Sequence, residues 1–504
     1  MTKLNRWIAG AATAVAGILA IGLAAPLGTG PAQAAGSPLS SEAIYSTAAD
    51  LVGFAPRATG SAGGAATADY IQNRFRGVGL DRVYTEQSTS YDWHASNAGL
   101  SVAGTAIDAF PVQHSFIPAD AKAGTRTTGP NGRSAPVVDI GAGGIDGKNV
   151  KGKIVLFDLA FYLPTAGLLP LTEYINDPTG ELVDPEMMLT ANPYLTSLES
   201  TIRNAQQAGA VGFVGVLRDY FDSNRYHNEY YRKLAMTIPG MWVTRKEGAR
   251  LRALLARHGH RARIDLTVQR RAVTGRTVIG ILNGRSRDTL MVQSHHDSIG
   301  PGAVEDATGA AEVMALADHY GRAVTAGRAR RPAKTLMFIT FDTHFTGYQA
   351  HQAFVDKYIT RKATPYRIVG NATIEHVGKY ARKTRAGRLI TTDEAEPKGI
   401  FENVNPALKA AMAQSLSRRN VKAANLLNAS PFQLIDSGIP TDASFVLTAG
   451  VPIVSFICGP MYMYDDADTL DKIDRTQLRP VALFFRDVIE RLQATPSASI
   501  GLVP

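Results

Sequence analysis

The chain has 504 residues, of which 45% are hydrophobic and 19% are charged, a composition typical of a soluble globular protein. This length is enough for two domains, or for one large domain that carries an insertion. The formal net charge is +9, and the basic residues are scattered, with the densest run, RARR at 328–331, in an expected loop. This pattern argues against a nucleic-acid partner. The single cysteine, Cys458, excludes an intramolecular disulfide, so stability must come from the hydrophobic core.

The first 34 residues are typical of a secretion signal. Lys3 and Arg6 precede an apolar stretch over residues 7–27, and Ala32-Gln33-Ala34 offers a cleavage site. We therefore expect a secreted, extracellular protein, which stays membrane-anchored if the signal is not cleaved. No later segment has the uninterrupted apolar length of a transmembrane helix, so we expect no stable membrane insertion after cleavage.

Residues 38–133 predict two amphipathic helices, at 41–54 and 65–79, a strand at 81–86, and then short strands and loops. From 134 to 270 the pattern changes, with expected strands at 150–159 and 238–244, a helix end that runs into a buried strand over 205–217, and an Arg-rich helix at 246–258. The stretch 162–200 has the character of a long loop with a short helix. A self-contained unit of this kind between two parts of a larger pattern predicts an inserted domain over residues 134–270.

Strands and helices alternate in the main part, residues 271–495. Further strands are expected at 336–341, 367–375 and 453–458, and helices at 348–358, 405–415 and 476–493. Such alternation predicts the α/β class, with a mostly parallel mixed sheet and helices on both of its faces.

The stretch from Thr289 to Gly309, TLMVQSHHDSIGPGAVEDATG, carries the densest group of ionisable residues. A buried strand ends at His295-x-Asp297, and Glu305-Asp306 precedes a helix with apolar residues at helical spacing. Open α/β sheets place their chemistry at the carboxyl ends of strands. An imidazole with nearby carboxylates suits Zn²⁺, and a carboxylate behind the ring can orient it. Ordinary hydrogen bonding at a polar strand end is the other interpretation.

Several separated motifs resemble peptidase family M28, whose members are secreted zinc aminopeptidases and relatives that often carry an inserted protease-associated (PA) domain. The insertion resembles that domain in its GKIVL strand and AGAVG turn. The resemblance covers nearly the whole mature chain and implies a zinc-peptidase-like sheet with a β-rich PA-like insertion. It rests on RATGSAGGAATADYIQNRFRGVGL, HDS at 296–298 after His295, EDATG at 305–309, FDTHFTGYQAHQAFV at 341–355, IEHVG at 374–378, TDASF at 441–445, AGVP at 449–452 and DADTLDKID at 466–474.

The resemblance implies a two-zinc site, and the match to it is uneven. The first-metal histidine falls on His295, with Asp297 as the carboxylate behind it. The bridging aspartate falls on Glu305, with Asp306 as an alternative ligand, and a later aspartate ligand falls on Glu375. The lengthened side chains can still bind a hard or borderline cation.

The second half of the site departs from the family. The family's Glu-Glu pair falls on His344-Phe345, and its late histidine ligand falls on Tyr464, so we expect the second metal to be lost. Phe345 and Tyr464 would then line a pocket at the lost ligand positions. For His344 three roles remain open: a fourth ligand of a single zinc, a general base, or a polar residue at a strand end.

Four more histidines are expected to take no part in metal binding. His296 follows the proposed ligand His295, and His376 follows the proposed ligand Glu375. Because side chains alternate along a strand, both histidines would turn to the opposite face. His319 and His351 fall on predicted helices, where surface or interhelical positions are expected.

Two functions follow from these residues. One is a secreted metal-dependent hydrolase of the M28 type, an aminopeptidase-like enzyme that cleaves peptide or other amide bonds with one zinc. The other is an inactive pseudo-peptidase that binds peptides or cell-wall fragments and needs no metal. Glutaminyl cyclase activity ranks low, because those relatives keep the Glu and the late His that this chain lacks. The sequence does not reveal the oligomeric state or the substrate's side chain.

Overall fold

The computed structural model describes residues 36–502 apart from 118–122, 163, 191, 229–233 and 435–437. The predicted secretion signal lies outside the described residues. The described residues form one sixteen-stranded sheet and a separate two-stranded hairpin, β14 (Lys379–Lys383) with β15 (Leu389–Ala395). Among the described helices, none is long and apolar enough to cross a membrane.

The main part of the sheet is parallel at its centre and antiparallel toward its edges. Strands β12, β11, β13 and β18 run parallel, so their carboxyl ends lie at the same edge. In spatial order the strands are β1 (Arg82–Val102), β10 (Arg261–Leu282), β12 (Lys334–Phe341), β11 (Ser286–His295), β13 (Arg367–Ile374), β18 (Ile453–Cys458), β16 (Lys398–Glu402), β17 (Ala424–Asn428) and β7 (Thr172–Asn176).

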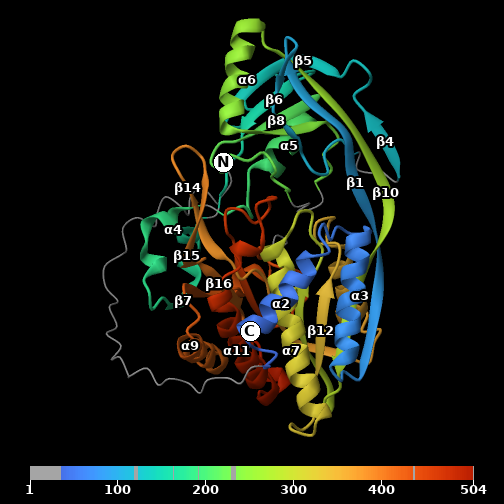
Figure 1. Ribbon diagram of the computed structural model, residues 1–504, viewed down its shortest axis with the longest axis vertical. Coiled ribbons are helices and arrows are strands. Elements are labelled where there is room, and N and C mark those ends of the chain that lie inside the picture. Colours follow the sequence, from blue (N-terminus) through green and yellow to red (C-terminus); the bar gives the residue numbers. More distant parts are fainter. Residues whose placement is uncertain are drawn as a thin grey trace. The chain divides into compact units, whose positions relative to one another are not determined.

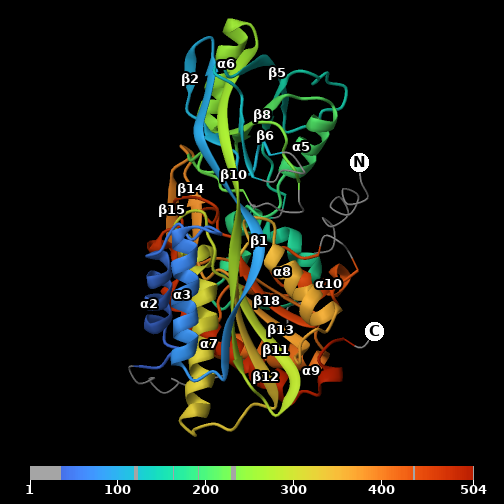
Figure 2. The same ribbon diagram turned by 90° about the vertical axis from the view of Figure 1, so that its right-hand side faces the viewer.

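Helices cover both faces of this sheet, as predicted. Figure 2 shows α2 (Ser41–Val52), α3 (Ala62–Gly77) and α7 (Thr308–Thr325) on one side, and α8 (Gln349–Phe354) and α10 (Ser444–Thr448) on the other. Two further helices, α9 (Pro406–Arg419) and α11 (Arg475–Ala494), pack against each other. Serine hydroxyls cap the first two helices, since Ser40 accepts from the Ala43 amide and Ser61 from the Gly64 amide.

A second hydrophobic core gathers around the remaining strands of the sheet. In spatial order these are β3 (Phe110–Pro111), β9 (Gly240–Thr244), β8 (Gly212–Leu217), β6 (Ile154–Asp158) and β5 (Arg133–Gly141). The same part of the chain contains the helices α5 (Leu198–Gln207) and α6 (Arg245–His258) and the short strands β2 (Thr105–Ile107) and β4 (Gly124–Thr127). The core includes Leu100, Val102 and Ile107, so it begins well before the predicted boundary at residue 134. Figure 1 shows β1 and β10 running side by side between this group of strands and the main sheet.

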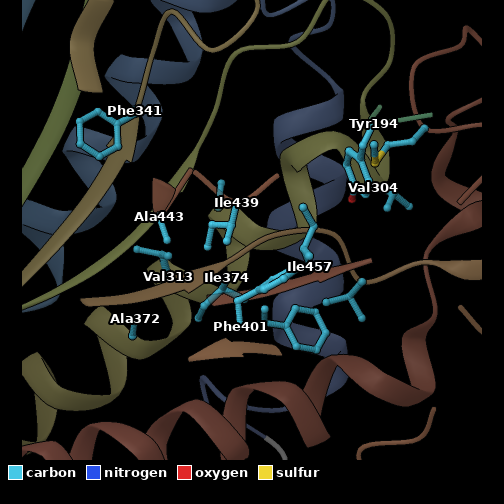
Figure 3. Packing of buried hydrophobic residues seen from close by; sticks show 14 of the residues in the cluster. Tyr194, Val304, Val313, Phe341, Ala372, Ile374, Phe401, Ile439, Ala443 and Ile457 are labelled. Carbon is cyan, nitrogen blue, oxygen red and sulfur yellow. The ribbon is translucent and has the colours of Figure 1, made fainter. Parts of the chain in front are cut away.

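The segment 162–200, which was expected to be a long loop with a short helix, has such a helix but also contributes a strand to the main sheet. Its β7 pairs antiparallel with β17, and a short helix, α4 (Pro185–Leu189), follows. Tyr194 from this segment belongs to the main hydrophobic core together with Val313, Ile374 and Phe401. Figure 3 shows these residues in that core. The inserted segment therefore reaches the edge of the sheet where the central parallel strands end.

Candidate metal centre

His295 is the last residue of β11, and the turn that follows it is held by a buried arginine. The guanidinium of Arg57 donates to the carbonyl oxygens of His296 (2.9 Å), Pro301 (2.9 Å) and Gly302 (2.8 Å). Arg57 is fully buried. These three hydrogen bonds fix the path of the chain between His295 and Glu305.

Glu305 lies in η5 (Ala303–Ala307), directly before α7, and its backbone is held by Asp468. The carboxylate of Asp468 accepts from the amides of Val304 and Glu305, both at 2.9 Å. The peptide bond between Glu305 and Asp306 is cis. The Glu305 side chain meets His295, with 3.2 Å between Oε1 and the Nε2 of the ring.

Asp306, the alternative ligand, has its oxygens occupied by other donors. Its Oδ1 accepts from the amides of Gly309 and His376, both at 3.0 Å, and its Oδ2 accepts from the hydroxyl of Ser294. Asp306 thus joins the start of α7 to the ends of β11 and β13. It belongs to neither of the two groups of side chains in the described residues that could hold a metal ion.

His376 lies in the site, so the prediction that it faces away is wrong. It follows the end of β13 with φ of 62°, a left-handed conformation that breaks the alternation of side chains along the strand. Its Nε2 contacts Glu305 Oε2. Its Nδ1 lies 2.9 Å from the carbonyl oxygen of Cys458 and 3.1 Å from the hydroxyl of Tyr194, and the Tyr194 ring stacks on the imidazole.

The facing atoms of His295, Glu305 and His376 lack hydrogen-bond partners. Within the described part of the chain, no acceptable hydrogen bond is made by Nε2 of either histidine or by either oxygen of Glu305. Each Nδ1 instead faces a carbonyl oxygen, that of Asp297 at 3.2 Å for His295 and that of Cys458 for His376. With its proton on Nδ1, each ring turns a lone pair toward a carboxylate, which only a cation or a proton between them can satisfy.

The charges of this group depend on one another. Burial alone would raise the pKa of Glu305, but the facing His376 and His295 lower it overall. Burial acts to lower the pKa of His376, yet Glu305 offsets this and raises it to about 9. For His295, burial and His344 act to lower the pKa, while Asp297 and Glu305 raise it well above the ordinary value. The pocket therefore favours cations, whether protons or a metal.

His344 stacks on His295, with ring centroids 3.9 Å apart, and belongs to a second group of ionisable residues. Its Nδ1 lies 3.0 Å from Asp442 Oδ1, and its Nε2 lies 3.3 Å from the Tyr348 hydroxyl and 3.6 Å from Glu305 Oε1. Asp442 Oδ2 is 3.0 Å from Nε2 of His351, which is buried and not at the surface. Burial would raise the pKa of Asp442, but His351 and His344 hold it well below its usual range.

Glu375 does not join the ligands with which it was predicted to act. Its Oε1 accepts a hydrogen bond from the Asp442 amide at 3.0 Å, and it lies outside both groups of described side chains that could hold a metal. Burial, together with Asp442, raises the pKa of Glu375 well above its usual range. The structure therefore puts His376 beside Glu305 in place of the predicted Glu375.

Asp297 lies behind His295, where it was predicted. Its Oδ1 is 3.5 Å from the Nδ1 of His295 and accepts from the amide of His344 at 3.2 Å, while its Oδ2 accepts from the amide of Phe345 at 3.2 Å. His296, by contrast, points to the hydroxyl of Thr340 at 3.1 Å, away from the site as predicted.

Phe345 and Tyr464 come together at the mouth of the site, with ring centroids 6.1 Å apart. They line a pocket with Glu305 and Ser298, and the cavity is only about 10 Å³, close to the smallest space that holds one water. The two aromatic side chains thus leave little free space beside Glu305.

Two groups of described side chains could hold a metal ion: His295, Glu305 and His376, and His295, His344 and Asp442. In the second group, His344 and Asp442 already hydrogen-bond each other. In the first, the facing atoms have no hydrogen-bond partner among the described residues, and two imidazoles with one carboxylate form a donor set that catalytic zinc sites use. The first group therefore fits a zinc ion better.

Comparison with known proteins supports the fold. The model of peptidase family M28 matches residues 277–489. This part of the chain is similar to peptidase family M28. Among solved structures, the chain is similar to a peptidase M28 precursor from Shewanella amazonensis SB2B (19% identity, TM-score 0.63, 92% of this chain and 95% of that one). It is also similar to a zinc aminopeptidase from Bacillus subtilis (18%, 0.60, 92% and 98%) and to an aminopeptidase from Aneurinibacillus sp. strain AM-1 (18%, 0.60, 92% and 95%).

The comparison with curated proteins finds no match. The predicted resemblance to peptidase family M28 is confirmed over residues 277–489, and the predicted fold class is confirmed by the shared fold. The PA-like nature of the insertion and the loss of a metal stay predictions.

Sequence reasoning missed His376 and Tyr194 as parts of the site. For His376 the available signal was its place beside Glu375 in IEHVG, at the carboxyl end of a strand. Asp442 and Asp468 lie in TDASF and DADT, so the motifs had indicated their segments without giving them a role.

Proposed function

We propose that this protein is a metal-dependent hydrolase of peptide or other amide bonds, with one zinc ion held by His295, Glu305 and His376. The observation that carries the proposal is the set of four facing, buried atoms without hydrogen-bond partners in the described residues. A buried lone pair that faces a carboxylate is unfavourable unless a proton or a metal cation lies between them, and zinc can take the place of the proton. Similarity to a peptidase family supports the choice of amide bonds.

Zinc is the metal favoured by the chemistry of the donors. Two imidazoles and one carboxylate make a catalytic zinc set, and each ring is oriented from behind, His295 by Asp297 and His376 by the Cys458 carbonyl. When bound there, zinc would polarise a substrate carbonyl and lower the pKa of water. Zinc in the Bacillus subtilis aminopeptidase, a neighbour in fold, agrees with this choice.

His344 is the group best placed to move a proton. Asp442 holds its Nδ1 at 3.0 Å, which orients the ring, while Nε2 is directed toward Glu305 and Tyr348. The imidazole can accept a proton from water and pass it to the leaving amine. This role replaces the carboxylate base that the family resemblance implies at the same position.

The small pocket favours a second function, the inactive pseudo-peptidase. Phe345 and Tyr464 leave room for about one water beside Glu305, and Glu305 itself is 1% exposed. A peptide enters only if these aromatic side chains move. The metal content of the protein and its hydrolytic activity separate the two functions.

The test uses the full mature chain, stripped with a chelator, reloaded with zinc, desalted and measured by elemental analysis. We expect about one zinc per chain for the wild type and for Glu375→Gln, and little zinc for His376→Gln. Hydrolysis of aminoacyl nitroanilides is then compared between the stripped and reloaded proteins, with His344→Gln as the variant that keeps zinc and loses rate.

Each outcome separates the alternatives. Zinc retained in His376→Gln but lost in Glu375→Gln would restore the ligand set predicted from the sequence. Two zinc ions per chain would contradict the one-metal site. A folded wild type that binds no zinc and hydrolyses nothing would favour the pseudo-peptidase.

A further inference from the structure

A second pocket lies beside the metal centre and is separated from it by Tyr194 and His376. It is bounded by the start of β16, the end of β18 and the inserted segment around α4. Tyr194 and Cys458 line it, and both contact the far side of His376. Figure 3 shows Tyr194, Phe401 and Ile457, three of the residues that line this pocket. Glu305 is not among the residues that line it.

The pocket contains a buried lysine and a buried glutamate whose side chains are not paired with each other. Lys398 is 1% exposed, and its ammonium group donates to the Glu396 carbonyl oxygen at 3.0 Å. Glu396 is 8% exposed, and the described residues offer no hydrogen-bond partner for its Oε2. No ion pair within 4.0 Å joins the two side chains among the described residues. Both groups thus have bonding capacity left for a ligand.

A third buried polar group of the pocket also has bonding capacity left for a ligand. Asn425, on β17, is 4% exposed and lines the pocket, and its Oδ1 finds no hydrogen-bond partner in the described part of the chain. An unpaired buried acceptor is unfavourable, and so is an unpaired buried carboxyl group. Two such acceptors beside one ammonium group make this a site built for a ligand, not a chance gap in packing.

The pKa values of Glu396 and Lys398 are both shifted toward the uncharged form, as expected for buried groups without a paired counter-charge. Burial raises the pKa of Glu396 to about 8, against a smaller opposing effect of Lys398. Burial also lowers the pKa of Lys398, despite the nearby Asp474 and Cys458. A ligand that brings a cation to Glu396 and an anion to Lys398 would reverse both shifts.

We propose that this pocket binds a small zwitterion, a free α-amino acid with a short side chain. Its carboxylate would accept from Lys398, and its ammonium group would donate to Glu396 and Asn425. The apolar side chains of Leu168, Met187 and Ile457, which also line the pocket, suit the aliphatic part of the ligand.

The size of the cavity selects the short side chain. Its volume of about 40 Å³ corresponds to roughly three waters, or about 90 Å³ of liquid. Glycine and alanine fit this space, and leucine does not. The proposal does not depend on the metal centre, because none of the three polar groups contacts a proposed metal ligand.

The test is isothermal titration calorimetry of the chelator-treated full-length mature protein with alanine, glycine and leucine. Propionate, which lacks the ammonium group, and ethylamine, which lacks the carboxylate, are the control ligands. We expect alanine and glycine to bind, and leucine and both controls to bind at least tenfold more weakly. Lys398→Met should weaken alanine at least tenfold, whereas Lys379→Met, which changes a lysine of β14 outside the pocket, should not.

A variant that blocks the pocket covers the case in which Lys398→Met does not fold. Thr190→Trp places bulk into the pocket from beside α4 without touching its charged groups, and it should abolish alanine binding. Three results overturn the proposal: no binding of alanine or glycine by the folded protein, equal binding of propionate or ethylamine, or binding that Thr190→Trp leaves intact. Alanine binding that appears only after zinc is added places the ligand at the metal centre and also overturns it. Loss of zinc binding alone would refute the proposed function and leave this site untouched.

Discussion

The affinity of the metal centre for zinc should rise with pH well above neutrality. Without a metal, His376 has a pKa of about 9, because Glu305 offsets the effect of burial. Zinc binds only the neutral imidazole, so the bound proton competes with the metal wherever the pH is below this value. At pH 7 this competition from His376 alone weakens apparent zinc binding by about 100-fold, or ~2.7 kcal/mol.

The sign follows from the direction of the shift. A raised pKa means that the metal-free protein keeps its proton to higher pH, so affinity increases by about tenfold per pH unit up to about pH 9 and then levels off. His295, whose pKa is also raised, makes the slope steeper where it too is protonated. The assay is competition with a chromogenic zinc chelator across about pH 6 to 9.5, with Glu375→Gln as a variant that keeps the slope. An affinity that is constant above pH 7, as for a histidine of ordinary pKa, would refute the reasoning.

Three further predictions concern single side chains. Tyr194→Phe removes the hydroxyl 3.1 Å from His376 Nδ1 but leaves the Cys458 carbonyl in place. Zinc binding should therefore weaken by about 10-fold or less in chelator competition, without loss of folding. Unchanged affinity would show that the hydroxyl does not orient the ring. Glu312→Met should raise the free energy of unfolding in urea by about 1–3 kcal/mol, because neither buried oxygen of Glu312 has a partner in the described residues; a less stable variant would contradict this. Arg57→Met should lower that free energy by about 3–5 kcal/mol and release zinc, since three carbonyl oxygens lose a charged donor; a fully stable, zinc-binding variant would exclude the role given to Arg57.

The parts of the fold that local pattern determines were predictable. The apolar run Ile453–Cys458 was predicted as a strand with the bounds that the structure has, and the helix predicted over 246–258 begins one residue earlier, at Arg245. In both cases, side-chain periodicity and composition within a few residues decide the structure. The resemblance to the family was also predictable, because the order of motifs along the chain can be recognised without knowing where any side chain points.

The composition of the site was not predictable in the same way. His376 enters the site because its own backbone, just after the end of β13, has a positive φ. The alternation of side chains along a strand does not predict such a conformation. Tyr194 reaches it because a segment far away in the sequence returns to pair β7 with β17. Likewise, the long β1 was predicted only at its start, since most of its residues are polar or half-exposed and it is stabilised by pairing with β10. These features arise from tertiary contacts.

The paired strands β1 and β10 bear on how the protein responds to mechanical force and to truncation. With 21 and 22 residues, each extends over ~70 Å and contributes to both hydrophobic cores without an intervening linker. Deleting the smaller core would leave two long polar strands whose edge backbone groups are unpaired, and such edges can pair with another chain. Pulled from its ends, the molecule should therefore rupture in one event, where two modules joined by a tether would rupture in two.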